Sequence, residues 1–137
     1  MPFRVLIVDD SAFIRRALKR ILGAEPDFEV TASAANGRLA LRALEEHTVD
    51  VVVLDVEMPV MGGLETLAAI RARDRSLPVV MFSTLTTQGS ESTMEALTRG
   101  ASDYVAKPSN QESQEQAFQT VRDHLVPKLR SLAESHA

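Results

Sequence analysis

Residues 51–63 read Val51-Val52-Val53-Leu54-Asp55-Val56-Glu57-Met58-Pro59-Val60-Met61-Gly62-Gly63. The first four residues are apolar and mostly β-branched, which predicts a strand buried on both faces, because a half-exposed strand would alternate with polar residues. This strand ends at Asp55, and Pro59 and the two glycines then lead the chain away from the sheet. Ligands of open parallel sheets bind at the carboxyl ends of the strands. Asp55 is therefore a candidate functional carboxylate, unless it only caps the next helix.

Length and composition indicate one domain. The chain has 137 residues, and 15 basic residues against 19 acidic ones give a net charge of −4, which argues against nucleic-acid binding through a basic patch. The absence of cysteine excludes disulfides and thiolate metal sites and is compatible with a cytoplasmic protein. No apolar run reaches the roughly 18 to 20 residues of a membrane span, and the N-terminal apolar stretch ends in two aspartates, unlike a signal peptide. We therefore expect a cytoplasmic protein without a membrane partner.

Strands and helices are predicted to alternate along the whole chain. The expected strands are residues 3–8, 28–34, 51–55, 79–82 and 103–106. Helical periodicity follows each strand, in residues 12–23, 37–47, 64–73, 91–100 and from 118 to near the C-terminus. Such alternation with short loops predicts an α/β fold, a parallel sheet with helices on both faces. Five strands suit the doubly wound, flavodoxin-like order 2-1-3-4-5, with the weakly apolar residues 28–34 at an edge.

Capping residues and apolar stripes predict how the helices begin and which faces they bury. The candidate N-caps are Ser11, Asn36 and Ser90. The last of these follows a polar loop over residues 85–89. The stripes expected to face the core include Phe13, Leu39 and Met94. Pro127 should kink the final helix, because it removes the hydrogen bond to the carbonyl of Asp123.

One polar helix face is basic. It consists of Arg15, Arg16, Lys19 and Arg20. We interpret it first as a solvated face, with a docking surface for an acidic partner as the alternative. His47 is interpreted as a surface residue at a helix end, because no other histidine or cysteine lies near it in the sequence.

Polar residues follow four of the five strands. In the order 2-1-3-4-5 the carboxyl ends of strands 1, 3, 4 and 5 share one edge, which carries Asp9, Asp10, Asp55, Ser83 or Thr84, and Lys107. Clustered carboxylates repel one another, so they persist where a hard cation binds. A set of oxygen ligands alone suits Mg²⁺ or Ca²⁺.

This set of residues suits phosphoryl transfer to a carboxylate. A carboxylate that attacks phosphorus needs a cation bridging the nucleophile and the phosphoryl oxygens, and donors around those oxygens. Asp55 is the available nucleophile, and Asp9 and Asp10 can hold the metal. Lys107 can pair with the phosphoryl group, and the hydroxyl of Ser83 can donate to it.

Three other classes of protein fit the sequence less well. A flavodoxin would bind the flavin phosphate after strand 1, where this chain has two negative charges. A P-loop enzyme needs G-x-x-x-x-G-K-[ST], which is absent. A phosphatase with an aspartyl intermediate usually has a second carboxylate two residues after the nucleophile, on the first strand. Glu57 has this spacing but follows the wrong strand.

Four motifs together resemble the receiver domain of bacterial response regulators over essentially the whole chain. They are Val8-Asp9-Asp10-Ser11, Leu54-Asp55-Val56-Glu57-Met58-Pro59, Phe82-Ser83-Thr84 and Tyr104-Val105-Ala106-Lys107-Pro108. The resemblance implies a CheY-like fold with Asp55 as the phosphoacceptor and phosphorylation by a histidine kinase. It also implies Mg²⁺ bound by Asp9, Asp10, Asp55 and the main-chain carbonyl of Glu57. Lys107 would contact the phosphoryl group, and Ser83 and Tyr104 would form a switch pair.

A narrower resemblance is to the N-terminal regulatory domain of chemotaxis protein-glutamate methylesterase, on residues 58–67, 83–90 and 100–109. It implies a chemotaxis-type kinase as partner. Gly62 departs from the pattern, which usually has Asp there, so the cap of the third helix is in doubt. We expect residues 1–110 to form the receiver core and residues 111–137, as part of the same domain, to form the last helix and the start of a linker.

No residues remain for the esterase domain itself, so the chain alone would have only self-phosphorylation and dephosphorylation chemistry. It is then either an excised regulatory domain or a stand-alone receiver. An adaptor that works by protein contacts without phosphorylation is the alternative from another class.

Overall fold

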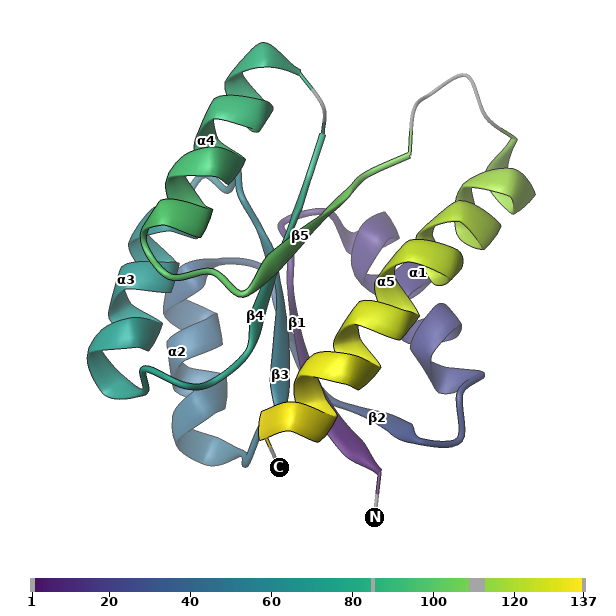
Figure 1. The fold of residues 1–137 in the computed structure, drawn as a ribbon, viewed down its shortest axis with the longest axis horizontal. Coiled ribbons are helices and arrows are strands. Elements are labelled where there is room, and N and C mark those ends of the chain that lie inside the picture. The colour runs from purple at the N-terminus through teal and green to yellow at the C-terminus, as the bar shows by residue number, and fades with distance from the viewer. Residues whose placement is uncertain (1, 85, 109–112, 137) are drawn as a thin grey trace.

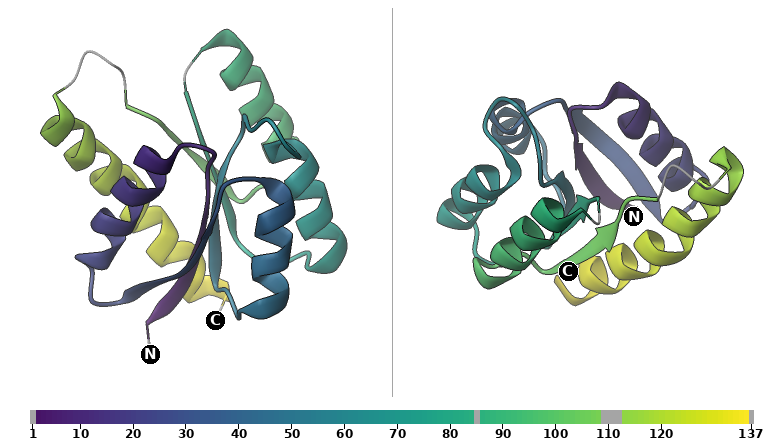
Figure 2. Two further views of the ribbon diagram at one scale, coloured as in Figure 1. Left: turned by 180° about the vertical axis from the view of Figure 1, so that it is seen from behind. Right: turned by 90° about the horizontal axis from the view of Figure 1, so that it is seen from above.

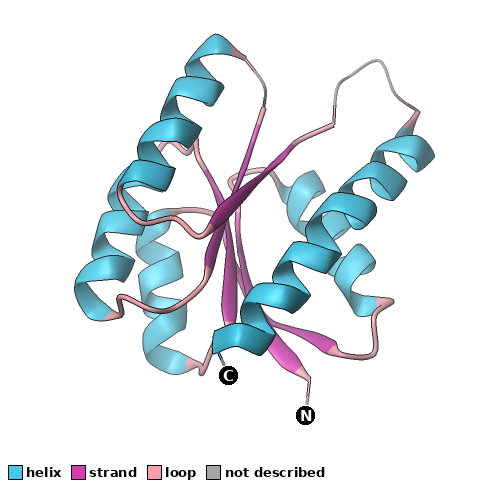
Figure 3. Ribbon diagram, viewed as in Figure 1, coloured by secondary structure: helices cyan, strands magenta, loops and turns pink. Residues whose placement is uncertain are grey.

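A five-stranded parallel sheet forms the centre of the molecule in the computed structural model, which describes residues 2–84, 86–108 and 113–136. The strands are β1 (Phe3–Val8), β2 (Phe28–Ala34), β3 (Val51–Asp55), β4 (Val79–Ser83) and β5 (Asp103–Ala106). They alternate with the helices α1 (Ala12–Gly23), α2 (Gly37–Glu46), α3 (Gly63–Arg73), α4 (Thr87–Thr98) and α5 (Gln114–His136) (Figure 3). None of the described helices is both long and apolar enough to cross a membrane.

The strand order is β2-β1-β3-β4-β5, which confirms the predicted fold. All four neighbouring pairs are parallel. β3 lies in the centre, and each of its residues is buried, as the apolar run from Val51 to Leu54 predicts. β2 lies at the edge next to β1, with a register shift between Val5 and Leu6.

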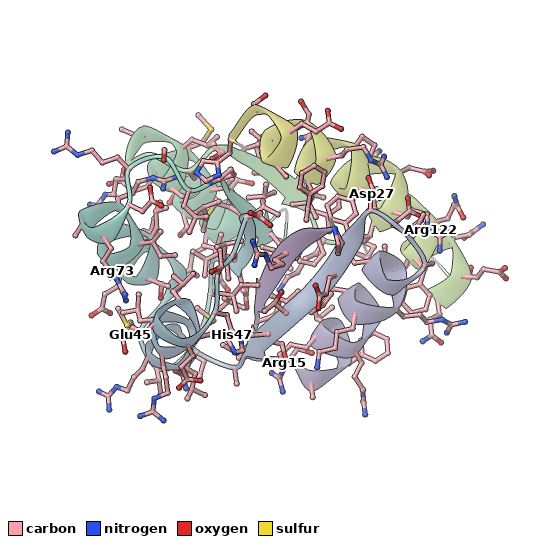
Figure 4. All side chains as sticks on the ribbon, turned by 90° about the horizontal axis from the view of Figure 1, so that it is seen from below. Arg15, Asp27, Glu45, His47, Arg73 and Arg122 are labelled. Carbon is pink, nitrogen blue, oxygen red and sulfur yellow. The ribbon has the colours of Figure 1, made fainter. Side chains whose placement is uncertain are left out.

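Alternate residues of β1, β3 and β4 enter two separate cores. One core contains Val5, Ile7, Val51, Val53, Val80 and Phe82 together with residues of α1 and α5. The other contains Leu6, Val8, Val52, Leu54, Val79 and Met81 together with residues of α2, α3 and α4. Figures 1 and 2 show the same division, with α1 and α5 on one face of the sheet and the other three helices on the opposite face. On the latter side, Arg73 of α3 lies beside Glu45 of α2, at 3.6 Å (Figure 4).

The carboxyl ends of the strands share one edge, drawn at the top of Figure 1, and both ends of the chain lie at the opposite edge. The backbone fixes two of these strand ends to each other, because the N–H of Lys107 donates to the carbonyl of Ser83 at 2.8 Å. Residues that follow the strands are thereby held beside one another.

Two of the predicted N-caps are confirmed. The side chain of Ser11 accepts a hydrogen bond from the N–H of Ile14, and that of Asn36 accepts one from Leu39. Gly62 caps α3 without a side-chain hydrogen bond. His47 is the exposed C-cap of α2, as expected.

The predicted start of α4 is wrong. The helix begins at Thr87, and its N-cap is Thr86, whose hydroxyl accepts from the N–H of Gly89, so residues 87–89 are helical and not part of a loop. Residue 85 lies outside the described residues. Gly89 permits this early start because a Cβ atom there would clash with the carbonyl oxygen of Thr84.

Phe13, Leu39 and Met94 are exposed, so their predicted inward orientation is wrong. Met94 is 63% exposed because α4 buries Gly89, Thr93 and Ala96, a small and partly polar face that a search for large apolar residues misses. In α2 the buried residues are likewise small, namely Gly37, Ala40 and Ala43. Phe13 lies in the first turn of α1, beyond the end of β1.

α5 starts at Gln114, earlier than the predicted residue 118, and continues without a break through Pro127. Residues 109–112, which precede it, lie outside the described residues. Proline in a helix interior removes one hydrogen bond. Burial of Val126 and Leu129 on either side of Pro127 holds the helix against the sheet.

Candidate functional site

Three carboxylates meet at the carboxyl edge. β1 and β3 pair with Val8 opposite Leu54, so the residues that follow, Asp9 and Asp55, become neighbours. Their side chains are buried, whereas the side chain of Asp10 is exposed. One carboxylate oxygen from each of the three lies within 4.8 Å of the others.

Lys107 reaches this cluster from the end of β5. Its Nζ atom lies 3.1 Å from Oδ2 of Asp9 and 3.1 Å from Oδ1 of Asp55. It also lies over the ring of Phe82, 5.5 Å from the ring centroid, on the intervening strand β4. The ammonium therefore bridges two buried carboxylates, and an aromatic face supports it.

Burial and neighbouring charges together shift the pKa values of Asp55 and Lys107. Burial raises the pKa of Asp55 to about 7; the charge of Lys107 opposes the rise and the charge of Asp9 adds to it. Burial lowers the pKa of Lys107, but the charges of Asp55 and Asp9 outweigh it, so its pKa is raised above the usual value. Lys107 therefore stays positively charged beside the cluster at neutral pH.

The carboxylate oxygens differ in their hydrogen bonds. Oδ1 of Asp9 accepts from the N–H of Ser11 at 3.0 Å, and Oδ1 of Asp55 accepts from the N–H of Glu57 at 3.3 Å. Oδ2 of Asp9 is buried and makes no hydrogen bond of good geometry to any described residue, although Lys107 lies at ion-pair distance. This oxygen can still coordinate a cation, which fits the predicted oxygen-ligand site.

A cavity of about 280 Å³ opens onto the cluster. Its lining residues are Asp10, Asp55, Glu57, Ser83, Thr84 and Lys107. The structure therefore brings together every residue predicted for the metal and the phosphoryl group, with Asp9 buried behind them. It does not bring Tyr104 to this cavity.

Tyr104 lies on the surface of β5 and is 42% exposed. Lys128 of α5 holds it there, because its Nζ atom lies 5.2 Å from the ring centroid and donates to the Tyr104 carbonyl at 2.8 Å. The same ammonium pairs with Asp103 at 3.3 Å. Sequence reasoning missed Lys128, since only the fold brings α5 to β5.

The hydroxyl of Ser83 contacts α4. Its Oγ lies 2.7 Å from Oγ1 of Thr93, and both side chains are buried. Thr84, the next residue, is exposed. Thr93 was also missed, although a threonine in an apolar helix stripe is a signal that a buried hydroxyl has a partner.

A second, larger cavity of about 490 Å³ lies between α1 and α5, and Lys107 and Thr84 line it as well. Part of the basic face of α1 has contacts within the protein. Arg15 donates to the carbonyl of Asp9 at 2.7 Å, and Arg20 lies 5.7 Å from the ring centroid of Phe118. Arg16 and Lys19 are exposed, as a solvated face predicts.

A doubly wound α/β sheet with three aspartates and a lysine at its carboxyl edge defines a receiver-type domain. The family model described as "Response regulator receiver domain" matches residues 5–119, and the chain belongs to this family. The predicted family is thereby confirmed.

Similar proteins include protein-glutamate methylesterases. The chain is 47% identical over 133 residues to a protein-glutamate methylesterase/protein-glutamine glutaminase of Nocardioides sp., covering 96% of this chain and 36% of that protein. It is 47% identical to a protein of the same name from Geobacillus kaustophilus, covering 97% of this chain and 37% of the relative. The chain thus spans little more than a third of the length of these relatives.

Two solved structures are also similar to this chain. The response regulator domain of Thermotoga maritima CheB has a TM-score of 0.85 and 38% identity, with 98% of each chain covered. A CheX-CheY-BeF₃-Mg²⁺ complex from Borrelia burgdorferi has a TM-score of 0.72 and 33% identity, covering 90% of this chain and 89% of that one.

Proposed function

We propose that this chain is a phospho-accepting receiver domain in which Asp55 accepts a phosphoryl group from a histidine kinase in the presence of Mg²⁺. The observation that carries the proposal is the position of Lys107, 3.1 Å from Asp55 and from the buried Asp9, beside a cavity open to solvent. A fixed ammonium next to a carboxylate nucleophile stabilises the negative charge of an incoming phosphoryl group.

The two oxygens of Asp55 have different roles in this proposal. Both hydrogen bonds that the carboxylate accepts from described residues end on Oδ1, from Glu57 and from Lys107. Oδ2 is therefore the oxygen that forms the new bond to phosphorus, while the bond from phosphorus to the imidazole nitrogen of the kinase's phosphohistidine breaks and the histidine leaves. Lys107 then pairs with a phosphoryl oxygen, and the hydroxyl of Ser83 or Thr84 donates to another from the wall of the cavity.

The carboxylates of Asp9, Asp10 and Asp55 and the main-chain carbonyl of Glu57 would hold Mg²⁺. A bound Mg²⁺ neutralises charge on the carboxylates and on the phosphoryl oxygens. Support comes from the three oxygens within 4.8 Å and from Oδ2 of Asp9, which is buried and whose one described polar partner is the ammonium of Lys107 at ion-pair distance. Oxygen ligands without nitrogen or sulfur suit this ion.

The relatives suggest the partners. Because similar chains form about a third of named protein-glutamate methylesterases, we infer that this domain regulates such an esterase and receives its phosphoryl group from a chemotaxis-type kinase in the cytoplasm. A stand-alone receiver would share the chemistry of Asp55 but act without an esterase domain. An adaptor that works without phosphorylation would lack this chemistry.

Intact-protein mass spectrometry tests the chemistry. The chain is incubated with a small acyl phosphate, with Mg²⁺ or with a chelator. We expect one added phosphoryl group with Mg²⁺ and none with the chelator. An unchanged mass with Mg²⁺ would favour the adaptor.

A further inference from the structure

Two buried hydroxyls connect the end of β4 to α4. Oγ of Ser83 and Oγ1 of Thr93 are 2.7 Å apart, and Thr93 also donates to the carbonyl of Gly89 at 2.8 Å. The next residue after Ser83 contacts the same turn, because Gly89 packs against the carbonyl of Thr84 closely enough to exclude a Cβ atom. The first turn of α4 is therefore joined to the strand end that lines the cavity.

The number of hydroxyl protons indicates which residue is the donor in this connection. Each hydroxyl has one proton to donate. Either hydroxyl could donate across the short contact, and the arrangement that also satisfies the carbonyl of Gly89 has Thr93 donating to Gly89 and Ser83 donating to Thr93. The other acceptor for Ser83, the carbonyl of Thr84, is 3.4 Å away and competes poorly. In this arrangement the proton of Ser83 is used in a bond to α4.

We propose that Thr93 is a positioning residue that competes with the phosphoryl group for the proton of Ser83. This inference rests on the proposed function and deepens it. When Ser83 donates to a phosphoryl oxygen, its bond to Thr93 breaks, whereas the bond from Thr93 to Gly89 remains. Thr93 therefore opposes activation by one neutral hydrogen bond, and α4 loses its polar contact with the strand end when the site is filled.

Removing the Thr93 hydroxyl should raise the affinity of the site for a phosphoryl group or its mimic. One neutral hydrogen bond has a net value equivalent to about a fivefold change in an equilibrium constant. Thr93→Val keeps the shape of the side chain and removes the hydroxyl. In saturating Mg²⁺ we expect it to bind beryllofluoride about fivefold more tightly than the parent, as measured by calorimetric titration.

Matched variants separate this effect from a general change in α4. Thr93→Ser retains the hydroxyl and should bind like the parent. Thr98 makes the same type of bond on the same helix, donating to the carbonyl of Met94 at 3.0 Å, but it is exposed. Thr98→Val should therefore leave the affinity unchanged. If Thr93→Val folds poorly, Thr93→Ala serves in its place.

The decisive control is the Thr93→Val substitution in a chain that lacks the Ser83 hydroxyl. In a Ser83→Ala background, Thr93→Val should have no effect on beryllofluoride affinity, because no proton remains to compete for. A purely structural role would lower the melting temperature without a gain in affinity that depends on Ser83. If the parent binds but Thr93→Val binds equally well, or if the gain persists without Ser83, the inference is wrong and the proposed function stands. If the parent does not bind, both are overturned.

Discussion

Nζ of Lys107 lies 3.1 Å from Oδ1 of Asp55, although the two residues are 52 positions apart in the sequence. The contact exists because β3, β4 and β5 are neighbours and all end at the same edge. The same ammonium lies 3.1 Å from the buried Asp9. Lys107 is therefore the counter-charge for two carboxylates that the sheet removes from water.

The first prediction concerns this counter-charge. Lys107→Met should lower the free energy of unfolding in metal-free buffer by about 3 kcal/mol, because breaking a buried pair leaves a charge without compensation. Urea denaturation measures the change. Lys19→Met, on the exposed face of α1, is the control and should stay within about 0.5 kcal/mol of the parent. Equal stability of the two variants would contradict the bridging role.

The second prediction concerns Mg²⁺. Asp10 is exposed, so Asp10→Asn should leave the metal-free protein as stable as the parent or slightly more stable, through relief of repulsion from Asp9 and Asp55. At 100 times its dissociation constant, Mg²⁺ should stabilise the parent by about 2.7 kcal/mol. This increment should disappear in the variant. Melting curves with and without Mg²⁺ provide the test, and full stabilisation of Asp10→Asn by Mg²⁺ would remove Asp10 from the metal site.

The third prediction concerns acid stability, far from the site. Arg130 donates to Asp27 at 2.6 Å and to Glu25 at 3.1 Å, and the hydrogen bond from Arg130 lowers the pKa of Asp27 below its ordinary 3.8. A lowered pKa contributes stability that is present above pH 3.8 and is lost as the pH falls through the lower, folded-state value.

Arg130→Met should therefore be less stable than the parent at pH 7, and the difference should shrink below pH 3.8. Urea midpoints across this range measure it, with Arg16→Met as an exposed control. A difference that stays constant down to the acid limit would show that packing of the Arg130 side chain on Phe28, and not the ion pair, stabilises the fold.

The fourth prediction concerns Tyr104. It is the only tyrosine in a chain without tryptophan, so its fluorescence reports on one site. Beryllofluoride with Mg²⁺ should change this signal, because Ser83 moves toward Asp55 and the ring enters the vacated space. Ser83→Ala should weaken the change while leaving binding mostly intact. If Ser83→Ala responds like the parent, Thr84 becomes the candidate hydroxyl, and an unresponsive parent would disprove the switch.

The sequence was sufficient to predict the edge that carries the site. Asp9 and Lys107 directly follow β1 and β5, Asp55 ends β3, and parallel strands place their carboxyl ends together. A topology argument could therefore assemble residues from distant segments without coordinates. The apolar run of β3 likewise predicted its central position, since only a strand covered on both faces lacks polar alternation.

The features of α4 that the sequence did not predict depend on tertiary contacts. Thr86 and Ser90 can both cap a helix, and the choice between them rests on how Gly89 fits against Thr84. The orientation of Met94 could not be predicted from apolar periodicity, because the buried face of α4 includes the hydroxyl of Thr93.

The central claim is that Asp55 itself accepts the phosphoryl group, and the most direct measurement is to locate the modification. The chain is treated with a small acyl phosphate and Mg²⁺, and borohydride then reduces the phosphorylated aspartate to homoserine. Peptide mass spectrometry should find homoserine at position 55 alone, and Asp55→Asn should show none. Homoserine at Asp9 or Asp10, or at a surface carboxylate with Asp55 unmodified, would contradict the account.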